Sequence, residues 1–279
     1  MIIGVDIGGS TTDAVFLDEG LHVVTVEAND PVAAAAGALA KLAEKLSVGL
    51  GEVRALAATG GGSRHLGERL LGIPVHKVSE IVAIGVGGAT LANKDRTLVV
   101  SLGTGTALVN VQGEDIQHVG GTGVGGGTLL GLAKHLLQVS RLDTLERLAA
   151  SGDLAHVDLT VGDIAGGPIG RLPAHATASN FGKFGADARP EDKARGLINM
   201  IAEVIVSLSV LAARASGQQD IVLTGKLLRV RPFVERVLAT SGLFDCRFIV
   251  PPHAEYATAI GAARFLLTCA ERATGSGAM

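Results

Sequence analysis

Two stretches of the sequence combine glycine with hydroxyl side chains in the way that phosphate-binding loops do. In residues 98–106 a β-branched run ends in a Gly/Thr turn, and in residues 120–128 a glycine-dense run leads into an apolar segment. Glycine lets the backbone approach a ligand closely, and free N–H groups at a helix N-terminus attract anions. We therefore predict a phosphate site here rather than a flexible surface loop. The candidate residues are Ser101, Gly103, Thr104, Gly105, Thr106, Gly121, Thr122, Gly123, Gly125, Gly126 and Gly127, with a further hydroxyl on Thr128.

A third candidate lies near the N-terminus, where an apolar strand over residues 2–7 enters a Gly-Gly turn and residues 14–17 return as a second strand. A carboxylate at the end of such a strand can hold Mg²⁺ through water while the turn amides meet phosphate. The alternative is that the carboxylate only caps the hairpin turn. The residues concerned are Asp6, Gly8, Gly9, Ser10 and Thr11.

Glu80 stands between an apolar strand over residues 75–78 and an apolar helix that opens at Ser79. In that position a carboxylate can act as a general base and deprotonate a hydroxyl that attacks phosphorus. Its alternative role is that of an acid in the first helical turn, where it complements the helix dipole.

The elements that must position these groups follow from the spacing of apolar residues and from turn signals. Two copies of a strand, a Gly/Ser/Thr turn and a strand, near residues 8 and 103, predict a duplicated domain in which each copy supplies one phosphate-facing hairpin. We expect strands over 2–7, 14–17, 22–27, 56–59, 75–78, 98–102, 107–111, 220–226 and 246–250, and an extended segment over 157–164. We expect helices over 31–46, with Asp30 as N-cap, and over 63–71, 79–89, 129–137, 143–150, 191–216, 231–240 and 257–269.

Composition excludes several function classes. Aromatic residues make up 3% of the chain and the net charge is −3, which argues against a nucleic-acid partner. Apolar stretches are interrupted before they reach membrane-spanning length. Cys246 and Cys269 form no zinc spacing, and the first residues lack a basic signal-peptide region, so we expect a cytoplasmic protein with free thiols. Gly225-Lys226 lacks the earlier glycine of a P-loop.

Together these motifs resemble the acetate kinase, sugar kinase, Hsp70 and actin superfamily, and within it the type II pantothenate kinases of the Fumble-like family. Residues 118–132 carry the most family-specific resemblance, because the first phosphate motif alone is shared with many members of the superfamily. The other matching segments are residues 4–11 and 101–106 for the two phosphate motifs, 178–183, 221–225 for the adenosine motif, and 257–262 for the terminal connecting helix.

The resemblance implies an α/β fold with a duplicated ribonuclease H-like arrangement, as in actin and Hsp70, in which mixed sheets are flanked by helices. The expected domains are residues 1–95 and 96–279. It also implies ATP and Mg²⁺ as cofactors, a small-molecule alcohol as substrate, and a homodimer for which the helix over 191–216 is a plausible interface.

The same resemblance implies roles for individual residues. Glu80 would be the catalytic base in the phosphorylation of pantothenate, and Asp6 would serve Mg²⁺ through water. Thr224 and Gly225 would contact the nucleotide. The implied substrate-binding residues are His118, Gly120, Ser179, Asn180, Phe181 and Tyr256.

His118 departs from the family pattern, which usually has an arginine just before the glycine run to meet the substrate carboxylate. A largely neutral imidazole does not reproduce a bidentate guanidinium–carboxylate pair. Either another cation serves, with Arg141, Arg171 and Lys183 as candidates, or the acceptor lacks that carboxylate, as pantetheine does.

Two further classes of protein stay open at this point. One is a non-catalytic ATP-binding regulator or ATPase of the same superfamily. The other is an activase-like or hydantoinase-type member, which the opening residues 5–14 also fit. An activase needs paired cysteines for an iron–sulfur cluster, and Cys246 and Cys269 give no such pattern.

Overall fold

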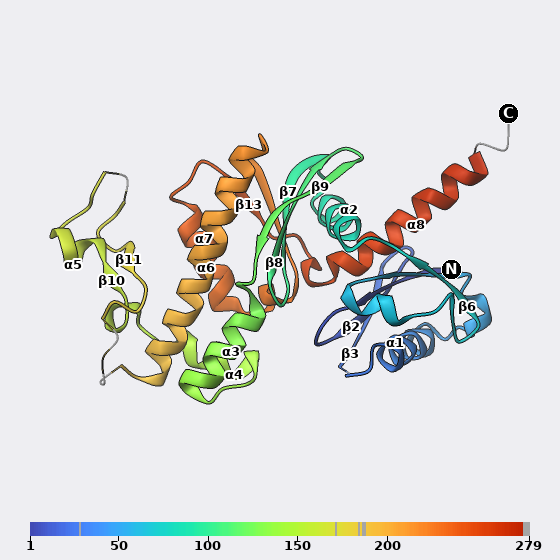
Figure 1. Ribbon diagram of the computed structural model, residues 1–279, viewed down its shortest axis with the longest axis horizontal. Helices are drawn as coiled ribbons and strands as arrows, with labels where there is room; N and C mark the ends of the chain where they lie inside the picture. Colours follow the sequence, from blue (N-terminus) through green and yellow to red (C-terminus); the bar gives the residue numbers. More distant parts are fainter. Residues whose placement is uncertain (28, 171, 184, 186–187, 276–279) are drawn as a thin grey trace.

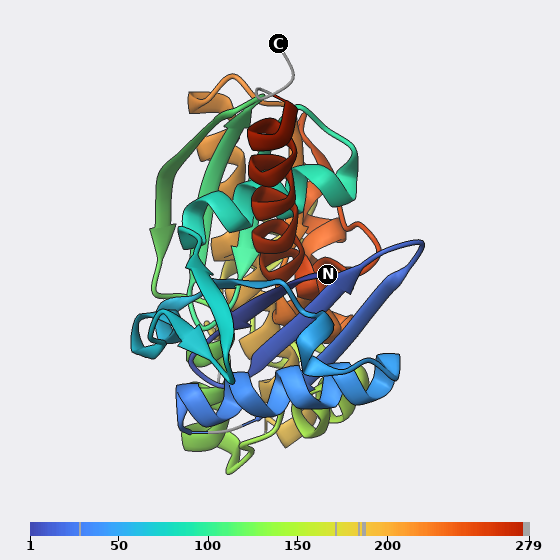
Figure 2. The same ribbon diagram turned by 90° about the vertical axis from the view of Figure 1, so that its right-hand side faces the viewer.

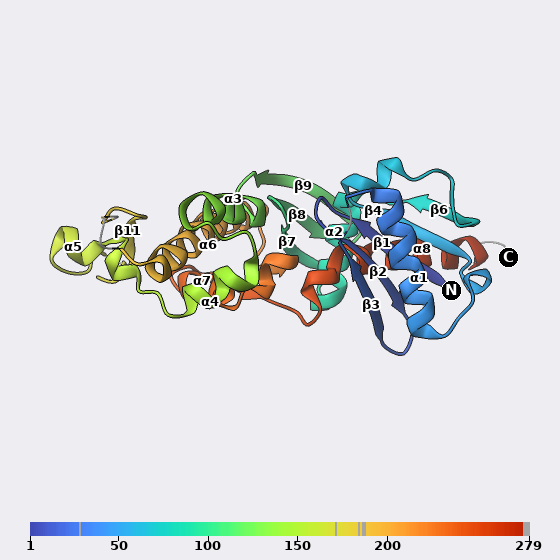
Figure 3. The same cartoon turned by 90° about the horizontal axis from the view of Figure 1, so that it is seen from below.

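The computed structural model describes residues 1–27, 29–170, 172–183, 185 and 188–275. Two large sheets follow one another along the long axis of the molecule, and a small two-stranded sheet lies at the far end (Figure 1, Figure 3). The sheets and the helices that cover them determine where each candidate residue lies.

The first sheet is built from β1 Ile2–Ile7, β2 Thr12–Leu17, β3 Leu21–Val26, β4 Ala55–Thr59, β5 Arg69–Leu70 and β6 Ile73–Lys77. Its strand order is β3-β2-β1-β4-β6-β5. The first three strands form antiparallel pairs, whereas β1, β4 and β6 run parallel to one another.

The second sheet is built from β7 Arg96–Leu102, β8 Thr106–Gln112, β9 Asp115–Thr122, β12 Asp220–Thr224 and β13 Arg247–Ile249, in the order β13-β12-β7-β8-β9. When the second sheet is listed from its other edge, as β9-β8-β7-β12-β13, it has the same order and the same strand directions as β3-β2-β1-β4-β6 of the first sheet. Only the edge strand β5 has no equivalent there. The register agrees as well, because Asp6 pairs with Thr59 where Ser101 pairs with Thr224. The predicted duplication is confirmed.

Successive side chains on the central strands point to opposite faces of each sheet, and helices cover both faces. The four helices that do so are α1 Pro31–Leu46, α2 Glu80–Ala92, α6 Pro190–Ala215 and α8 Ala257–Gly275. On β1, Val5 packs with α1 and Gly4 faces α8; on β7, Val100 packs with α6 and Val99 packs with α2. Asp30 caps α1 as predicted, since its carboxylate accepts from Ala33 N at 2.8 Å.

Each sheet is covered on one face by a helix that follows the other sheet in the sequence. α2 follows β6, yet Ile84 packs on Val99 and Val222 of the second sheet. α8 follows β13 and contacts β1, β2 and β4 of the first sheet. The two helices cross each other next to the first sheet (Figure 2). A division at residue 95 therefore stays a prediction, and each half is completed by a helix from the other half of the sequence.

The other elements are α3 Gly126–Leu137, α4 Leu142–Ala150, β10 Leu159–Thr160, α5 Val161–Ala165, β11 Thr177–Ser179 and α7 Arg231–Ser241, with short 3₁₀ turns η1 Leu50–Glu52, η2 Gly61–His65, η3 Leu154–His156, η4 Lys226–Arg229 and η5 Ala254–Tyr256. The small sheet of β10 and β11 and the helix α5 lie beyond α6, at the opposite end of the molecule from the first sheet (Figure 1).

Three expectations about these elements are corrected. The helix expected over 63–71 is a 3₁₀ turn followed by a hairpin, because Leu71 and Gly72 have φ of 52° and 82° and form the two-residue turn between β5 and β6. The extended segment over 157–164 ends early, because Thr160 and Asp163 cap α5 reciprocally. Residues 120–122, expected in a loop, belong to β9 and pair with β8.

Candidate functional site

The tips of the two predicted phosphate hairpins face each other across the boundary between the sheets. A Cβ built on Gly9 would lie 3.7 Å from Thr104 Oγ1, so the β1–β2 and β7–β8 turns are in van der Waals range. A ligand placed at this junction would meet both turns at once. The exposed residues at the junction are Gly8, Gly9, Ser10, Gly103 and Thr104.

A second pair of equivalent turns packs against the backbone of the hairpins. Gly60 after β4 and Gly225 after β12 have φ of 81° and 99°, a conformation that side chains disfavour. A Cβ on Gly60 would lie 2.6 Å from Ile7 O, and a Cβ on Gly225 would lie 2.8 Å from Leu102 N. Any side chain here would therefore displace the hairpin backbone. The sequence marked the turn at 60–62 but not its contact with β1.

Asp6 is the centre of a cluster of charged side chains. The pKa of Asp6 is raised to about 7, chiefly by burial and then by the carboxylates of Asp13 and Glu80, while the ammonium of Lys226 lowers it. These four groups therefore lie near enough to the end of β1 for the charges of three of them to change the pKa of Asp6. A concentration of carboxylates beside exposed turn amides is typical of a functional site that receives a cation. Asp13 and Lys226 were not among the predicted site residues.

The raised pKa of Asp6 predicts a pH-dependent cost to the ligand-free fold. Between about pH 4 and pH 7 the unfolded chain loses a proton that folded Asp6 retains, so stability falls as the pH rises through this window. Asp6→Asn removes the ionisation, and we expect its melting temperature in EDTA to exceed that of the wild type by several degrees at pH 8 and by little at pH 4.

Asp18→Asn is the matched control for this measurement. Asp18 is exposed and a hydrogen bond from Gly20 N lowers its pKa, so its replacement should cost stability at pH 8 rather than add to it. If Asp6→Asn melted at or below the wild-type temperature at pH 8, the carboxylate cluster would not be strained.

Glu80, the predicted general base, opens a helix next to the cluster around Asp6. It is the first residue of α2, its N-cap is Ser79, and its side chain is exposed. Its charge raises the pKa of Asp6, so the start of α2 lies near the end of β1. Sequence and structure agree on the element that carries Glu80.

His118 lies on the side of the second sheet that α2 covers. It is exposed on β9, and Ile116, two residues earlier on the same face, packs at Gly85 of α2. A Cβ on Gly121 would be 3.6 Å from His118 Nε2. The imidazole and the helix that carries Glu80 are thus on the same side of the sheet. Gly120 lies within β9 and pairs with Leu108 of β8.

The glycine-rich run is fastened to the second hairpin. Gly126 N donates to Gly103 O and Gly127 N donates to Thr104 O, both at 2.9 Å. The prediction that the N–H groups at the start of α3 are free is therefore wrong for Gly126 and Gly127. Backbone N–H groups take the carbonyl that packing brings within reach. A Cβ on Gly125 would lie 2.8 Å from Gly105, so this glycine also serves close packing.

Three threonine hydroxyls predicted near phosphate hold this loop instead. Thr106 Oγ1 donates to Val124 O at 2.8 Å and Thr128 Oγ1 donates to Gly123 O at 2.8 Å. Thr122 Oγ1 accepts from Val124 N at 3.2 Å. Gly121 and Gly123 are exposed, and their role at phosphate stays a prediction.

The predicted adenosine motif meets η5. Gly225 N donates to Ala254 O at 2.9 Å, and the hydroxyl of the buried Thr224 donates to Val100 O at 3.4 Å. Tyr256, predicted to bind substrate, accepts from Arg229 Nη2 at 2.8 Å and carries that guanidinium 5.4 Å from its ring centroid. Tyr256 thus lies with the adenosine motif, and Thr224 uses its hydroxyl within the sheet.

Ser179, Asn180 and Phe181 do not converge with Glu80 in this chain. Ser179 ends β11 and the other two residues follow it, beyond α6 and away from the hairpins (Figure 1). Asn180 Nδ2 donates to Glu203 Oε2 at 2.9 Å, and Phe181 N donates to Asp158 Oδ1 at 2.8 Å. The segment is anchored by Glu203 of α6 and by Asp158, which in turn accepts a hydrogen bond from Asn199 of α6.

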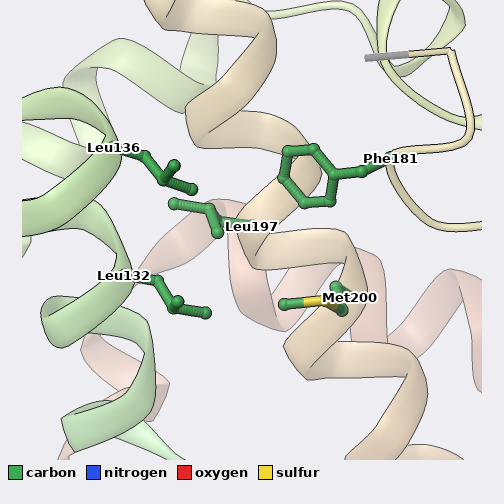
Figure 4. Close-up of a pocket in the computed structure, with 5 residues that line it drawn as sticks. All are labelled: Leu132, Leu136, Phe181, Leu197 and Met200. Carbon is green, nitrogen blue, oxygen red and sulfur yellow. The ribbon is translucent and has the colours of Figure 1, made fainter.

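An apolar pocket of about 340 Å³ lies between α3, α6 and the segment after β11 (Figure 4). Its lining within the described residues is apolar and uncharged, so it does not suit a polyphosphate. It is distinct from the hairpin junction. Its lining residues are Leu132, Leu136, Phe181, Leu197 and Met200.

The candidate cations for a substrate carboxylate have partners of their own. Arg141 Nη2 lies 3.0 Å from Asp143 Oδ2, and Lys183 Nζ lies 2.6 Å from Asp163 Oδ2. Arg171 lies outside the described residues. Both described cations are thus paired with nearby carboxylates, and their role at a substrate carboxylate stays a prediction.

Two global properties bear on the class of protein. The expectation that every apolar stretch is interrupted before membrane-spanning length is wrong for α6, which within the described part of the chain is the one helix long and apolar enough to cross a membrane. However, 61% of its most apolar window is buried in the core of the second half. Among the described residues, no group of three or more His, Cys, Asp or Glu side chains could hold a metal ion by itself.

Two sheets of identical topology, completed by exchanged helices and joined at facing glycine hairpins, define an actin/Hsp70-like ATPase fold. The activator of 2-hydroxyisocaproyl-CoA dehydratase from Clostridium difficile, solved with bound ADPNP, is similar with a TM-score of 0.71 and 17% identity over 99% of this chain and 97% of its own. The ROK hexokinase from Thermus thermophilus has a TM-score of 0.56 and 17% identity over 96% and 99% of the two chains. At these identities the likeness establishes the fold alone.

The chain belongs to the Fumble family, whose sequence model matches residues 92–264. It is similar to a type II pantothenate kinase of Oceanobacillus iheyensis, with 31% identity over 84% of this chain and 87% of the relative. It is also similar to a type II pantothenate kinase of Bacillus anthracis, with 27% identity over 81% of this chain and 83% of that relative. A mouse 4'-phosphopantetheine phosphatase is 35% identical over 59% of this chain, but that match covers 21% of the relative. The predicted family is thereby confirmed.

Proposed function

We propose that this chain is an ATP-dependent kinase that phosphorylates the primary hydroxyl of pantothenate, the first step of coenzyme A biosynthesis. One observation carries the proposal: Gly9 and Thr104 bring two glycine hairpins together, and Asp6, at the end of the first hairpin's strand, is near enough to Glu80 for the charge of Glu80 to raise its pKa. The relatives named type II pantothenate kinase supply the acceptor. The bound ADPNP of the fold neighbour supports a nucleotide at this junction.

The chemistry is phosphoryl transfer by positioning and charge neutralisation. The acceptor oxygen forms a bond to the γ-phosphorus of ATP while its proton passes to a carboxylate oxygen of Glu80. The bond from that phosphorus to the β–γ bridging oxygen breaks, and ADP leaves with the oxygen. Backbone N–H groups of the turns at Gly9 and Gly103 would stabilise the charge on the transferred group.

The carboxylates fit a magnesium ion that is brought by the nucleotide. Asp6 shares its field with Asp13 and Glu80, and this excess of negative charge favours a divalent cation. Asp6 would hold Mg²⁺ through water, with phosphate oxygens completing the shell. The ion would neutralise the β- and γ-phosphates when bound.

The acceptor is the part of the proposal that His118 leaves open. Purified protein with Mg·ATP should release ADP in the presence of pantothenate. We expect its KM for pantothenate to be higher than that of a variant with arginine at position 118, because imidazole replaces a bidentate guanidinium. His118→Arg should then lower the KM for pantothenate about tenfold or more, since a charge-assisted pair is worth roughly 1.5–3 kcal/mol. Pantetheine, which lacks the carboxylate, is assayed in parallel.

The outcomes separate the alternatives. Turnover with pantetheine alone, unchanged by His118→Arg, would replace the acceptor. Saturable Mg·ATP binding without turnover of either alcohol would favour a non-catalytic ATP-binding regulator of the same fold.

We also propose a cytoplasmic homodimer, in line with the sequence-based expectation. Leu211 on α6 is 62% exposed, a large apolar side chain on the helix expected at the interface. Exposed apolar side chains of this size are typical of contact surfaces when they cluster. Sedimentation velocity would give the oligomeric state.

A further inference from the structure

Lys226 reaches from the second half of the molecule into the first. It is the first residue of η4, directly after the Gly225 turn. Its Nζ lies 2.8 Å from Asp13 Oδ2 and donates a hydrogen bond to Thr11 Oγ1. Both partners belong to the first hairpin, so this ammonium links the two halves at the place where the proposed nucleotide would enter.

Asp13 is a fixed partner in this link. It is 3% exposed at the second residue of β2, and its other oxygen, Oδ1, accepts from Thr25 Oγ1 at 2.6 Å. A buried carboxylate held on both oxygens keeps its position, and it needs its cation because an unpaired buried charge is costly. The ammonium of Lys226 is therefore held in one place before any ligand arrives.

Lys226 is nevertheless accessible. Its side chain is 26% exposed, and contacts within the described part of the chain use two of the three N–H donors of the ammonium. Thr11, which receives one of them, is itself a predicted phosphate residue. A phosphate oxygen at this hairpin would lie within reach of the third donor.

The charge balance of the junction calls for such a cation. Asp13 and Glu80 carry negative charge into it, and the positive charge of Lys226 counteracts their effect on the pKa of Asp6. A polyphosphate adds further negative charge.

We propose that Lys226 binds the polyphosphate of the nucleotide and holds the two halves together around it. The identity of the ligand as ATP rests on the proposed function. The role itself is a property of this chain: a lysine after the adenosine motif, anchored by Asp13 and Thr11, supplies the positive side chain of the phosphate site. It touches the phosphates and takes no proton from the acceptor.

The test measures nucleotide binding without any acceptor. Isothermal titration calorimetry compares Mg·ATP with adenosine, which has no phosphate. Because Lys226→Met alone leaves Asp13 buried without its cation, the reference is Asp13→Asn and the test variant is Asp13→Asn with Lys226→Met. We expect the added Lys226→Met to raise the Kd for Mg·ATP at least about tenfold and to leave the Kd for adenosine unchanged. Lys226→Arg alone should stay within about threefold of the wild type, because it keeps the charge.

Equal losses for Mg·ATP and adenosine, or no loss for either, would overturn the proposal, because Lys226 would then only shape the fold. The result is independent of the acceptor. If Mg·ATP binding needs Lys226 but pantothenate is not phosphorylated, the proposed function fails and the role of Lys226 stands. If the wild type binds adenosine as tightly as Mg·ATP, both fail.

Discussion

Glu80→Gln should lower the kcat for phosphoryl transfer about 10²- to 10⁴-fold, the range expected when a positioned general base is removed. Glutamine keeps the size and the hydrogen-bonding oxygen of the side chain but cannot accept the proton of the attacking hydroxyl. The Kd for Mg·ATP should change far less than kcat, because Glu80 supplies only part of the negative charge that attracts the ion and its main role is at the acceptor. ADP release at saturating acceptor, with calorimetry for binding, measures both quantities.

Two controls separate catalysis from helix stability. Glu80 opens α2, so its loss also removes an interaction with the helix dipole that is worth at most about 1 kcal/mol. Glu191→Gln removes an acid from the first turn of α6 and should leave kcat unchanged. The pKa of Asp6 should fall in Glu80→Gln, since one of the carboxylates that raise it is gone. A kcat loss below about tenfold would mean that another group takes the proton.

Local patterns predicted the parts of the site that a single segment encodes. The hairpins around Gly9 and Gly103 are read from a strand, a glycine turn and a returning strand, and the structure has both. Glu80 is read from its place between a strand and a helix. Even the duplication follows, because the same pattern occurs twice and each copy must build the same sheet.

What failed was the assignment of partners that lie far apart in the sequence. The hydroxyls of Thr106 and Thr128 fit a phosphate loop by composition, but their acceptors are loop carbonyls that only the folded chain brings near. The sequence around Lys226 shows only a Gly-Lys pair without the earlier glycine of a P-loop. It gives no sign of the ion pair with Asp13, because Asp13 lies in the other half of the chain. Asn180 has the residue type of a substrate ligand, yet Glu203 of α6 takes its amide.

The crossing of α2 and α8 is another feature that no local pattern shows. Glycines inside apolar helices read as weak helix positions. In the structure Gly87 faces the carbonyl of Ala257 and Gly261 faces the carbonyl of Ala83, so each helix presents an alanine and, four residues later, a glycine to the other. The two backbones approach so closely that neither position has room for a side chain.

Gly87→Ala should therefore destabilise the protein by about 3 kcal/mol or more, or prevent it from folding, which is the upper range for overpacking. A Cβ on Gly87 would lie well under 3.0 Å from Ala257 O, and backbone atoms cannot rotate away as a flexible side chain would. Urea unfolding of wild type and variant measures the difference. Gly37→Ala in α1 is the control: its Cβ meets nothing within 4 Å, so helix propensity should add up to about 1 kcal/mol.

The same crossing ties the catalytic base to the rest of the fold. Gly87 lies seven residues after Glu80 on α2, so a variant that folds with the helices pushed apart also moves the base relative to Asp6. We expect such a variant to lose kcat while retaining Mg·ATP binding through the hairpins, a milder copy of Glu80→Gln. If Gly87→Ala unfolded within about 0.5 kcal/mol of the wild type and kept its kcat, the two helices could separate at little cost, and the position of Glu80 would depend on the second sheet alone.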